Sequence, residues 1–167
     1  MHFMKFCLGI LLFLVGVYSC TSSKKEDVKL IENYCQVVNK KSDCLDITVN
    51  PDTVALLEKI KVSKGNVLLI FTGRAISGKA LLDKEFLENN QIFDELKKYT
   101  IYLLYVDERN KVNDSIVYDE RNMRYHQAVY NSAVFPHYII YSNGVKQCEE
   151  NYLNEKERIN QFLHCVK

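Results

Sequence analysis

The segment "VLLIFTGRAISGKALLDKEF", residues 67–86, carries the strongest fold signal in the chain. Its first five residues are a continuous apolar run, typical of a strand buried on both faces of a sheet. Residues 73–79 then spell G-x-x-x-x-G-K, and a segment with helical spacing of apolar residues follows. A strand, a turn and a helix in this order suit a nucleotide-binding protein, and they also suit folds in which the same turn has another role.

Apolar periodicity predicts an alternation of helices and strands along the rest of the chain. In the first half of the chain we expect a helix over 27–40, a short strand over 46–49, and a helix that starts at Asn50-Pro51-Asp52 with Val54, Leu57 and Ile60 inward. Strands are expected over 67–71 and 101–106, joined by a long helical segment that breaks at Asn89-Asn90. After them we expect a polar loop over 108–119, a short helix over 122–130, a hairpin that turns at Ser142-Asn143-Gly144, and a helix over 155–166. This order predicts an α/β fold with a mixed sheet of four or five strands and helices on both faces.

The nucleotide-binding interpretation has little further support. In a working P-loop, a Ser or Thr after the lysine binds magnesium, and Ala80 occupies that position here. Asp107 ends an apolar strand as a Walker-B carboxylate would, but the chain after residue 80 is too short for the usual parallel core. Lys79 near a helix start would still favour weak anion binding. This interpretation is kept as a third alternative.

Three motifs in order resemble a known family. Phe71-Thr72-Gly73 ends the first buried strand, Leu104-Tyr105-Val106-Asp107 ends the second, and Pro136 opens the third just before the hairpin. The chain from residue 51 to the end resembles the thioredoxin fold, and in detail the periplasmic thioredoxin-like domain of bacterial thiol:disulfide interchange proteins. The resemblance implies a thioredoxin-like three-layer sandwich over residues 51–167, with Pro136 as the family's cis-proline.

The chain departs from this family at the redox motif. Matching Phe-Thr-Gly to residues 71–73 places the two cysteines of the family's Cys-x-x-Cys at Ile76 and Lys79. Thiol–disulfide exchange needs a thiolate and a second thiol that resolves the mixed disulfide, and these two residues supply neither. We therefore expect no catalytic residues at these positions and a redox-inactive thioredoxin-like domain.

The resemblance also implies a binding patch, formed by Arg74, Ile76, Phe135, Pro136 and His137. In thioredoxin-like folds the residue before the cis-proline, here Phe135, offers its backbone to an extended peptide in the manner of strand addition. The competing interpretation is that Phe135 belongs to the core.

The N-terminal segment "MHFMKFCLGILLFLVGVYSC" has one lysine and then an apolar stretch too short to span a bilayer, which indicates a signal peptide of lipoprotein type over 1–19. Val17-Tyr18-Ser19-Cys20 resembles the bacterial lipobox, in which Cys20 would carry the lipid. Tyr18 is bulkier than is usual there, so a plain signal peptide and an uncleaved anchor stay as alternatives. Residues 20–27 would be a tether and residues 28–50 an N-terminal helical extension. The protein would then be a membrane-anchored lipoprotein of the cell envelope, facing the periplasm or the outside.

Beyond Cys20, the cysteines are Cys35, Cys44, Cys148 and Cys165. Four cysteines allow three pairings, and structural disulfides are the default in an exported domain. The pairing that closes short loops joins Cys35 to Cys44 and Cys148 to Cys165. Two alternatives stay open: one pair is exposed and redox-active, or the thiols are free and buried.

His126, His137 and His164 do not cluster with cysteines at the spacing of metal ligands, so we expect no metal and no cofactor. A net charge of +1 gives no sign of a nucleic-acid partner. The sequence therefore predicts an exported module that binds an envelope protein or an extended peptide without redox turnover. The alternative is an envelope thiol–disulfide oxidoreductase that uses a non-standard cysteine pair.

Overall fold

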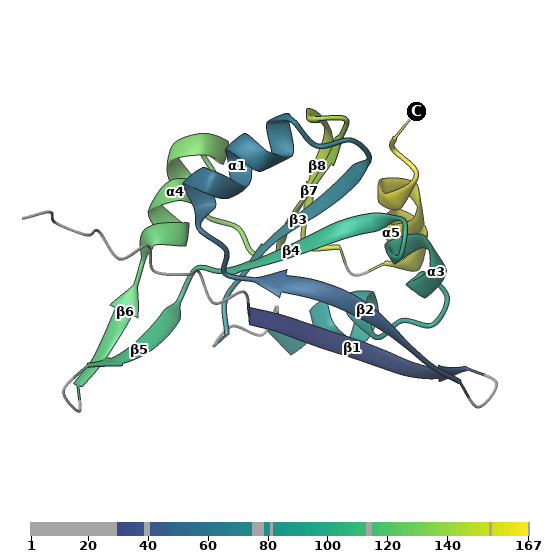
Figure 1. Ribbon diagram of the computed structural model, residues 1–167, viewed down its shortest axis with the longest axis horizontal. Coiled ribbons are helices and arrows are strands. Elements are labelled where there is room, and N and C mark those ends of the chain that lie inside the picture. The colour runs from purple at the N-terminus through teal and green to yellow at the C-terminus, as the bar shows by residue number, and fades with distance from the viewer. Residues whose placement is uncertain are drawn as a thin grey trace, which may run out of the picture.

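The computed structural model describes residues 30–38, 41–74, 79–80, 82–112, 115–153 and 155–166, with the side chains of 30–38, 41–43, 110–112 and 115–119 left out. Its centre is a six-stranded sheet with strand order β1-β2-β4-β3-β7-β8 (Figure 1). The strands are β1 (Leu30–Val38), β2 (Lys41–Val49), β3 (Asn66–Thr72), β4 (Tyr99–Tyr105), β7 (His137–Ser142) and β8 (Val145–Asn151). β2, β4 and β3 are parallel, whereas the pairs β1–β2, β3–β7 and β7–β8 are antiparallel, so the sheet is mixed.

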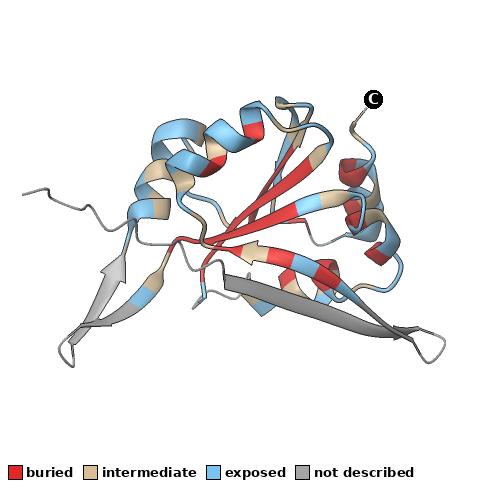
Figure 2. Ribbon diagram, in the orientation of Figure 1, coloured by how far each residue is buried: buried red, intermediate tan, exposed pale blue. Residues whose placement is uncertain are grey.

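Helices cover both faces of this sheet. α1 (Thr53–Lys61) and α4 (Arg121–Tyr130) lie on one face, and η1 (Leu82–Leu87), α3 (Phe93–Leu96) and α5 (Lys156–Leu163) lie on the other. Figure 2 shows buried residues along the central strands between these layers. The predicted α/β sandwich with a mixed sheet is confirmed, and β1 brings the number of strands to six, one more than the upper end of the prediction.

The predicted N-terminal helix is wrong. Residues 30–38 form β1, which pairs with β2 in continuous antiparallel register from Leu30 opposite Val49 to Val38 opposite Lys41. Tyr34 and Val38 are four residues apart, and this spacing fits one face of a helix as well as one face of a strand, because four is an even number. Pairing with a neighbouring strand decides between the two, and it also makes β2 longer than the strand predicted over 46–49.

The polar loop predicted over 108–119 is also wrong. Its residues form a hairpin of β5 (Glu108–Val112) and β6 (Ser115–Asp119), which make a separate two-stranded sheet. The hairpin extends away from the main sheet in Figure 1. Its strands are mostly polar, so the sequence contains no apolar alternation from which a strand could be inferred.

The start of α1 agrees with its prediction. The side chain of Asp52 accepts a hydrogen bond from the backbone N–H of Ala55 at 2.9 Å and so caps the helix. The buried residues of α1 are Leu56 and Ile60, whereas Val54, which was predicted to face inward, is exposed. The inward face of α1 is therefore rotated from the predicted one.

The segment between β3 and β4 is divided where a break was predicted. η1 ends at Leu87 and α3 begins at Phe93, with the two asparagines between them. The β7–β8 hairpin turns at Asn143-Gly144 as expected. Gly144 has a φ of +79°, and a Cβ atom there would overlap the backbone carbonyl of Lys61, so glycine satisfies both the turn and the close approach of α1.

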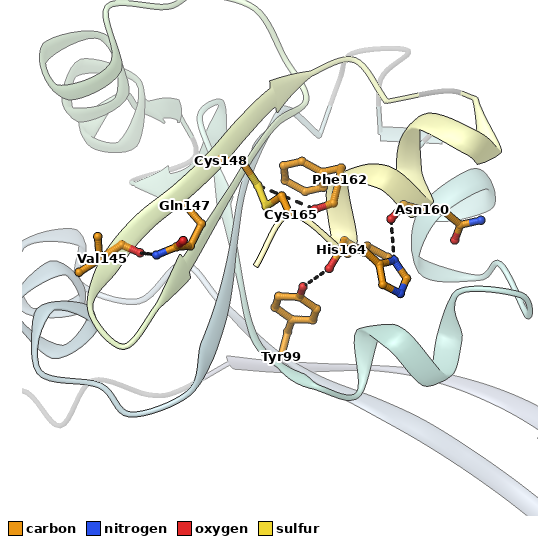
Figure 3. The surroundings of a disulfide bond; sticks show 9 residues. Tyr99, Val145, Gln147, Cys148, Asn160, Phe162, His164 and Cys165 are labelled. Carbon is orange, nitrogen blue, oxygen red and sulfur yellow. Dashed lines mark hydrogen bonds between the residues drawn. A yellow bond between two sulfur atoms is a disulfide. The ribbon is translucent and has the colours of Figure 1, made fainter. Parts of the chain in front are cut away.

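Cys148 of β8 and Cys165 after α5 form a disulfide between residues 17 apart in sequence (Figure 3). This is the predicted pairing, and it ties an edge strand to the last helix. Cys44 is also disulfide-bonded, and the residue opposite it in the β1–β2 ladder is Cys35. The side chain of Cys35 lies outside the described part, so the Cys35–Cys44 pairing stays a prediction.

Residues 1–29, with the predicted signal peptide, the tether and the lipidation site Cys20, lie outside the described residues. Within the ranges that the structure does describe, no helix has both the length and the apolar character that crossing a membrane requires. The lipoprotein and envelope assignments therefore remain predictions.

Candidate functional site

The segment after β3 and the segment before β7 emerge together at one end of the sheet. The two strands are antiparallel, and Phe71 near the end of β3 lies opposite His137 at the start of β7. Arg74 therefore leaves one strand where Phe135-Pro136 enters the other, and the peptide bond between Phe135 and Pro136 is cis. Both segments of the predicted patch thus meet here, while Ile76 lies outside the described residues.

Part of the predicted patch faces solvent and part does not. Val134 is 50% exposed, and Phe135 is half-buried against the apolar cluster beneath α1 and α4. Pro136 and His137 are buried in the free chain, and the ring of His137 turns inward to His126 of α4, so neither of these two predicted patch residues faces solvent. Val134 is the apolar side chain that the sequence analysis missed. Arg74 and residues 133–135 are called the Pro136 surface below.

The backbone of the Pro136 surface has unused hydrogen-bonding groups. The N–H of Val134 donates to Oγ of Ser132 at 3.3 Å, and the C=O of Pro136 accepts from the N–H of Tyr152 at 3.0 Å. Among the residues that the structure describes, neither the N–H nor the C=O of Phe135 has a hydrogen-bond partner. Free groups of this kind are what an added strand pairs with.

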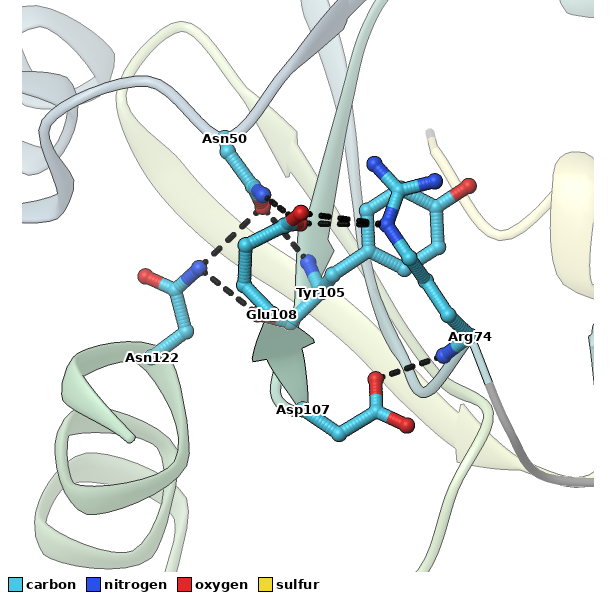
Figure 4. A network of polar contacts seen from close by, with 6 residues as sticks. All are labelled: Asn50, Arg74, Tyr105, Asp107, Glu108 and Asn122. Carbon is cyan, nitrogen blue, oxygen red and sulfur yellow. Dashed lines mark hydrogen bonds and ion pairs between the residues drawn. The ribbon is translucent and has the colours of Figure 1, made fainter. Parts of the chain in front are cut away.

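Arg74 is held at the rim of this surface by three contacts (Figure 4). Its backbone N–H donates to the carboxylate of Asp107 at 2.6 Å, and its Nε donates to Glu108 at 3.1 Å. Its Cζ lies 3.7 Å from the centroid of the Tyr105 ring. Asp107 thus fixes the backbone after Gly73, which is a structural role and not that of a Walker-B ligand.

Asn50 extends the same network to Asn122 in the first turn of α4 (Figure 4). Its side-chain oxygen accepts from the N–H of Tyr105 at 2.7 Å and from Asn122 at 3.2 Å, and its amide nitrogen donates to Glu108 at 2.5 Å. Asn122 in turn accepts from the hydroxyl of Thr53 at 2.7 Å. Asn50, Thr53, Glu108 and Asn122 line a surface cavity of about 600 Å³. No sequence pattern indicated the network, because its members lie far apart in the chain.

Lys79, which the sequence resemblance aligns with the family's second redox cysteine, forms an ion pair with Asp83 one helical turn later at 2.5 Å. Its Nζ also lies 5.9 Å from the centroid of the Tyr105 ring. Because a carboxylate already balances its charge, the geometry gives no support to phosphate binding at this lysine. Within the described residues, no group of three or more His, Cys, Asp or Glu side chains is arranged to hold a metal ion.

Two buried histidines lie beneath the Pro136 surface. Nε2 of His126 and Nδ1 of His137 are 2.7 Å apart, and the ring of His126 packs 4.8 Å from the ring of Phe135. Burial, together with the neighbouring His137, lowers the pKa of His126 to about 4. Burial also lowers the pKa of His137, although Glu149 favours its charged form. Both rings are therefore neutral at pH 7.

Solved structures identify the fold. The chain is similar to thioredoxin O2 from Arabidopsis thaliana in the oxidized state, with 13% sequence identity and a TM-score of 0.51, covering 72% of this chain and 93% of that one. It is also similar to a chain in a structure concerning thiol resolution in the yeast mitochondrial 1-Cys peroxiredoxin, with 8% identity, a TM-score of 0.50, and coverage of 70% and 92%. No family model and no curated protein matches. The chain has a thioredoxin-like fold, as the sequence predicted, and at these identities the similarity concerns the fold alone.

Proposed function

We propose that this chain is an exported, lipid-anchored thioredoxin-like protein that binds an extended peptide or a protein partner in the cell envelope, without thiol–disulfide exchange. The observation that carries the proposal is the unpaired backbone of Phe135 beside the exposed side chain of Val134. An incoming strand would pair with the N–H and C=O of Phe135 and would cover Val134, so that both hydrogen bonding and burial of apolar surface favour binding.

The lack of exchange chemistry is inferred from the residues at the motif positions. Ile76 cannot form a thiolate, and Lys79 is neither a thiol nor available as a free cation, because it is paired with Asp83. The envelope location is inferred from the apolar segment over 1–19 and from Cys20 after it. A lipid on Cys20 would hold the folded domain at the membrane through residues 20–27.

One observation favours the alternative function, exchange through a non-standard cysteine pair. The Cys148–Cys165 disulfide lines a surface cavity of about 190 Å³, so a small thiol can approach it. Its position argues for a structural role, since Cys165 follows the C-terminal end of α5, where the helix dipole disfavours a thiolate. We therefore assign this disulfide a structural role and test exchange separately.

Binding is tested with the full chain and a library of short, unstructured peptides. Val134→Asp places a charge in the centre of the Pro136 surface and should weaken binding of the tightest peptide by about tenfold or more, measured by calorimetry. Val145→Asp is the matched control, because Val145 is 62% exposed and is the first residue of β8, directly after the turn at the far end of β7. Equal weakening by both variants, or no peptide binding by the wild-type chain, would overturn the proposal.

A further inference from the structure

The hydrogen bond between the two buried imidazoles determines where their hydrogens lie. At 2.7 Å, one of the two nitrogens must carry a hydrogen and the other a lone pair. Nε2 of His137 lies 3.6 Å from the carboxylate of Glu149, which favours a hydrogen on that nitrogen and leaves Nδ1 of His137 as the acceptor. His126 then donates from Nε2, and its Nδ1 carries no hydrogen.

An additional proton would put a charge into an enclosed site. His126 is fully buried and His137 is 2% exposed. The rings of Phe71, Phe135 and Tyr130 lie 4.7, 4.8 and 5.5 Å from the ring of His126, centroid to centroid. Adding a further proton, on Nδ1 of His137, would place two N–H donors against each other, because Nε2 of His126 already donates to that nitrogen. The closed packing therefore fits the neutral pair and disfavours each added proton.

The titratable and charged groups around the pair come from three elements. α4 contributes Tyr125 and Tyr130, β7 contributes Tyr141, and β8 contributes Glu149 and Lys146. Burial raises the pKa of Tyr125 to about 12 and also raises that of Tyr130, so these two phenols stay neutral in acid. Glu149 favours a charged histidine and Lys146 opposes it, and the two form an ion pair at 3.2 Å that reduces the effect of either.

The loop of residues 131–136 closes the site on its solvent side. Phe135 packs on His126, and the backbone of Ser132 lies near enough to His126 to favour its charged form. The N–H of Asn131 donates to the C=O of Gln127 at 3.0 Å. Residues 131, 133 and 134 are exposed, so the loop has fewer buried side chains than the strands and the helix around the pair. Of the segments that enclose the pair, this loop therefore has the lowest free energy of local opening.

We propose that protonation of the His126–His137 pair opens the loop of residues 131–136, and that peptide binding at the Pro136 surface is lost in acid through this opening. The first part of the proposal needs no ligand, whereas the second rests on the proposed function. In the open loop His126 is hydrated, and its pKa returns from about 4 toward the ordinary 6.5. At pH values between these two pKa values the open form therefore binds more protons than the closed form. Lowering the pH from 7 to 5 raises the open fraction by about twentyfold.

Hydrogen exchange on the full chain without peptide tests the opening. The amides of Asn131 and Tyr152 report on the loop, because their hydrogen bonds hold its two ends, and the amide of Val106, bonded to Thr72 at 2.8 Å, reports on the sheet. Protection factors at Asn131 and Tyr152 should fall about twentyfold between pH 7 and pH 5, and at both pH values they should lie well below that of Val106, which exchanges only when the sheet unfolds. No fall at the loop amides, or equal protection factors at all three amides, would overturn the proposal.

His126→Phe removes the histidine whose pKa is lowered to about 4 and keeps an aromatic ring. In this variant the protection of the loop amides should depend on pH much less than in the wild type, and His137 accounts for the dependence that is left. The matched control is His164→Gln, because the side chain of His164 is 62% exposed and lies after α5, so its variant should respond to pH as the wild type does. Should His126→Phe fail to fold, the titration of His126 in the wild-type chain, followed by NMR, decides: a midpoint near 4 supports the proposal, and a midpoint near 6.5 overturns it.

Peptide affinity at pH 7 and pH 5 separates the two parts of the proposal. A loss of affinity at pH 5 that disappears in His126→Phe supports regulation of the Pro136 surface. An affinity that is unchanged while the loop amides lose protection overturns the regulation, although the opening stands. If no peptide binds at pH 7, the proposed function fails, and the opening is decided by hydrogen exchange alone.

Discussion

The guanidinium of Arg74 lies over the ring of Tyr105, with Cζ 3.7 Å from the ring centroid, while Nε of the same side chain donates to Glu108. These contacts join the residue that follows β3 to the end of β4. They fix the start of the loop that the sequence resemblance aligns with the Cys-x-x-Cys segment of thioredoxin-like proteins. The side chain of Arg74 is 37% exposed and that of Glu108 is 25% exposed, so solvent weakens both contacts.

Arg74→Ala should therefore lower the free energy of unfolding by about 1 kcal/mol, from the sum of one partly exposed ion pair and one cation–π contact. Urea unfolding measures this change. Lys84→Ala is the matched control. Lys84 is 82% exposed, and its distance of 3.9 Å from Glu85 makes a weak ion pair, so the substitution should leave the unfolding midpoint unchanged. Equal effects of the two substitutions would contradict the role of Arg74.

Asn50 combines a left-handed backbone, with a φ of +43°, and side-chain hydrogen bonds to three residues. Asn50→Ala loses the bonds and puts a residue that tolerates the left-handed region less well than asparagine at this position, so it should lower the free energy of unfolding by about 3 kcal/mol. Asn50→Gly loses the same bonds without the backbone strain and should cost about 1 kcal/mol less. Thermal unfolding compares the two variants. Identical losses would argue against the left-handed conformation.

The central elements were predictable because their signals are local. β3 and β4 are continuous apolar runs that are buried in the structure, and Ile159, Phe162 and Leu163 of α5 show helical spacing. β1 was not predictable, because the choice between helix and strand depends on a partner strand that the local pattern does not contain. The sequences of β5 and β6, ERNKV and SIVYD, do not alternate between apolar and polar residues, so hydrophobic periodicity could not find this hairpin.

The candidate site was predictable only where a family resemblance indicated which residues lie close together in the folded chain. That resemblance placed Phe135-Pro136 beside Arg74, although it did not show that His137 turns inward. The contact between His126 and His137 joins a helix to a strand across the interior, and spacing along the chain carries no signal for it. The same holds for the network around Asn50, whose members come from α1, β4, β5, α4 and the segment between β2 and α1.

Acid should weaken the fold as a whole. The pKa of His126 is about 4 in the folded chain against 6.5 ordinarily, so the unfolded chain binds more protons between these values. The stabilisation is complete above pH 6.5 and is lost as the pH falls toward 4; from pH 7 to pH 5 the loss is roughly 2 kcal/mol. Urea unfolding at both pH values measures it. A pH dependence that persists unchanged in His126→Phe would rule out this histidine as its source.

The Cys148–Cys165 disulfide should contribute to stability through the loop that it closes. Its cysteines are 17 residues apart, so replacing both with serine should lower the free energy of unfolding by about 3 kcal/mol. Chemical unfolding of the double variant measures the loss, and the wild-type chain with its disulfides reduced provides the comparison. A double variant as stable as the oxidised wild type would contradict a structural role.

The assignment of the lost redox positions can be tested by restoring them. The wild-type chain should not catalyse reduction of a disulfide substrate by dithiothreitol, whereas a chain with both Ile76→Cys and Lys79→Cys should gain turnover. Lys79→Cys alone lacks one of the two thiols and should stay inactive. Turnover by the wild type that disappears in Cys148→Ser would instead establish the alternative function.

The central claim is that an extended peptide adds to the backbone at Phe135. The most direct measurement is the hydrogen-exchange rate of the Phe135 amide in the full chain, with and without the tightest peptide from the library. This amide has no hydrogen-bond partner among the described residues of the free chain, so strand addition should slow its exchange by about tenfold or more. A peptide that binds while the Phe135 amide exchanges at its original rate would contradict the account.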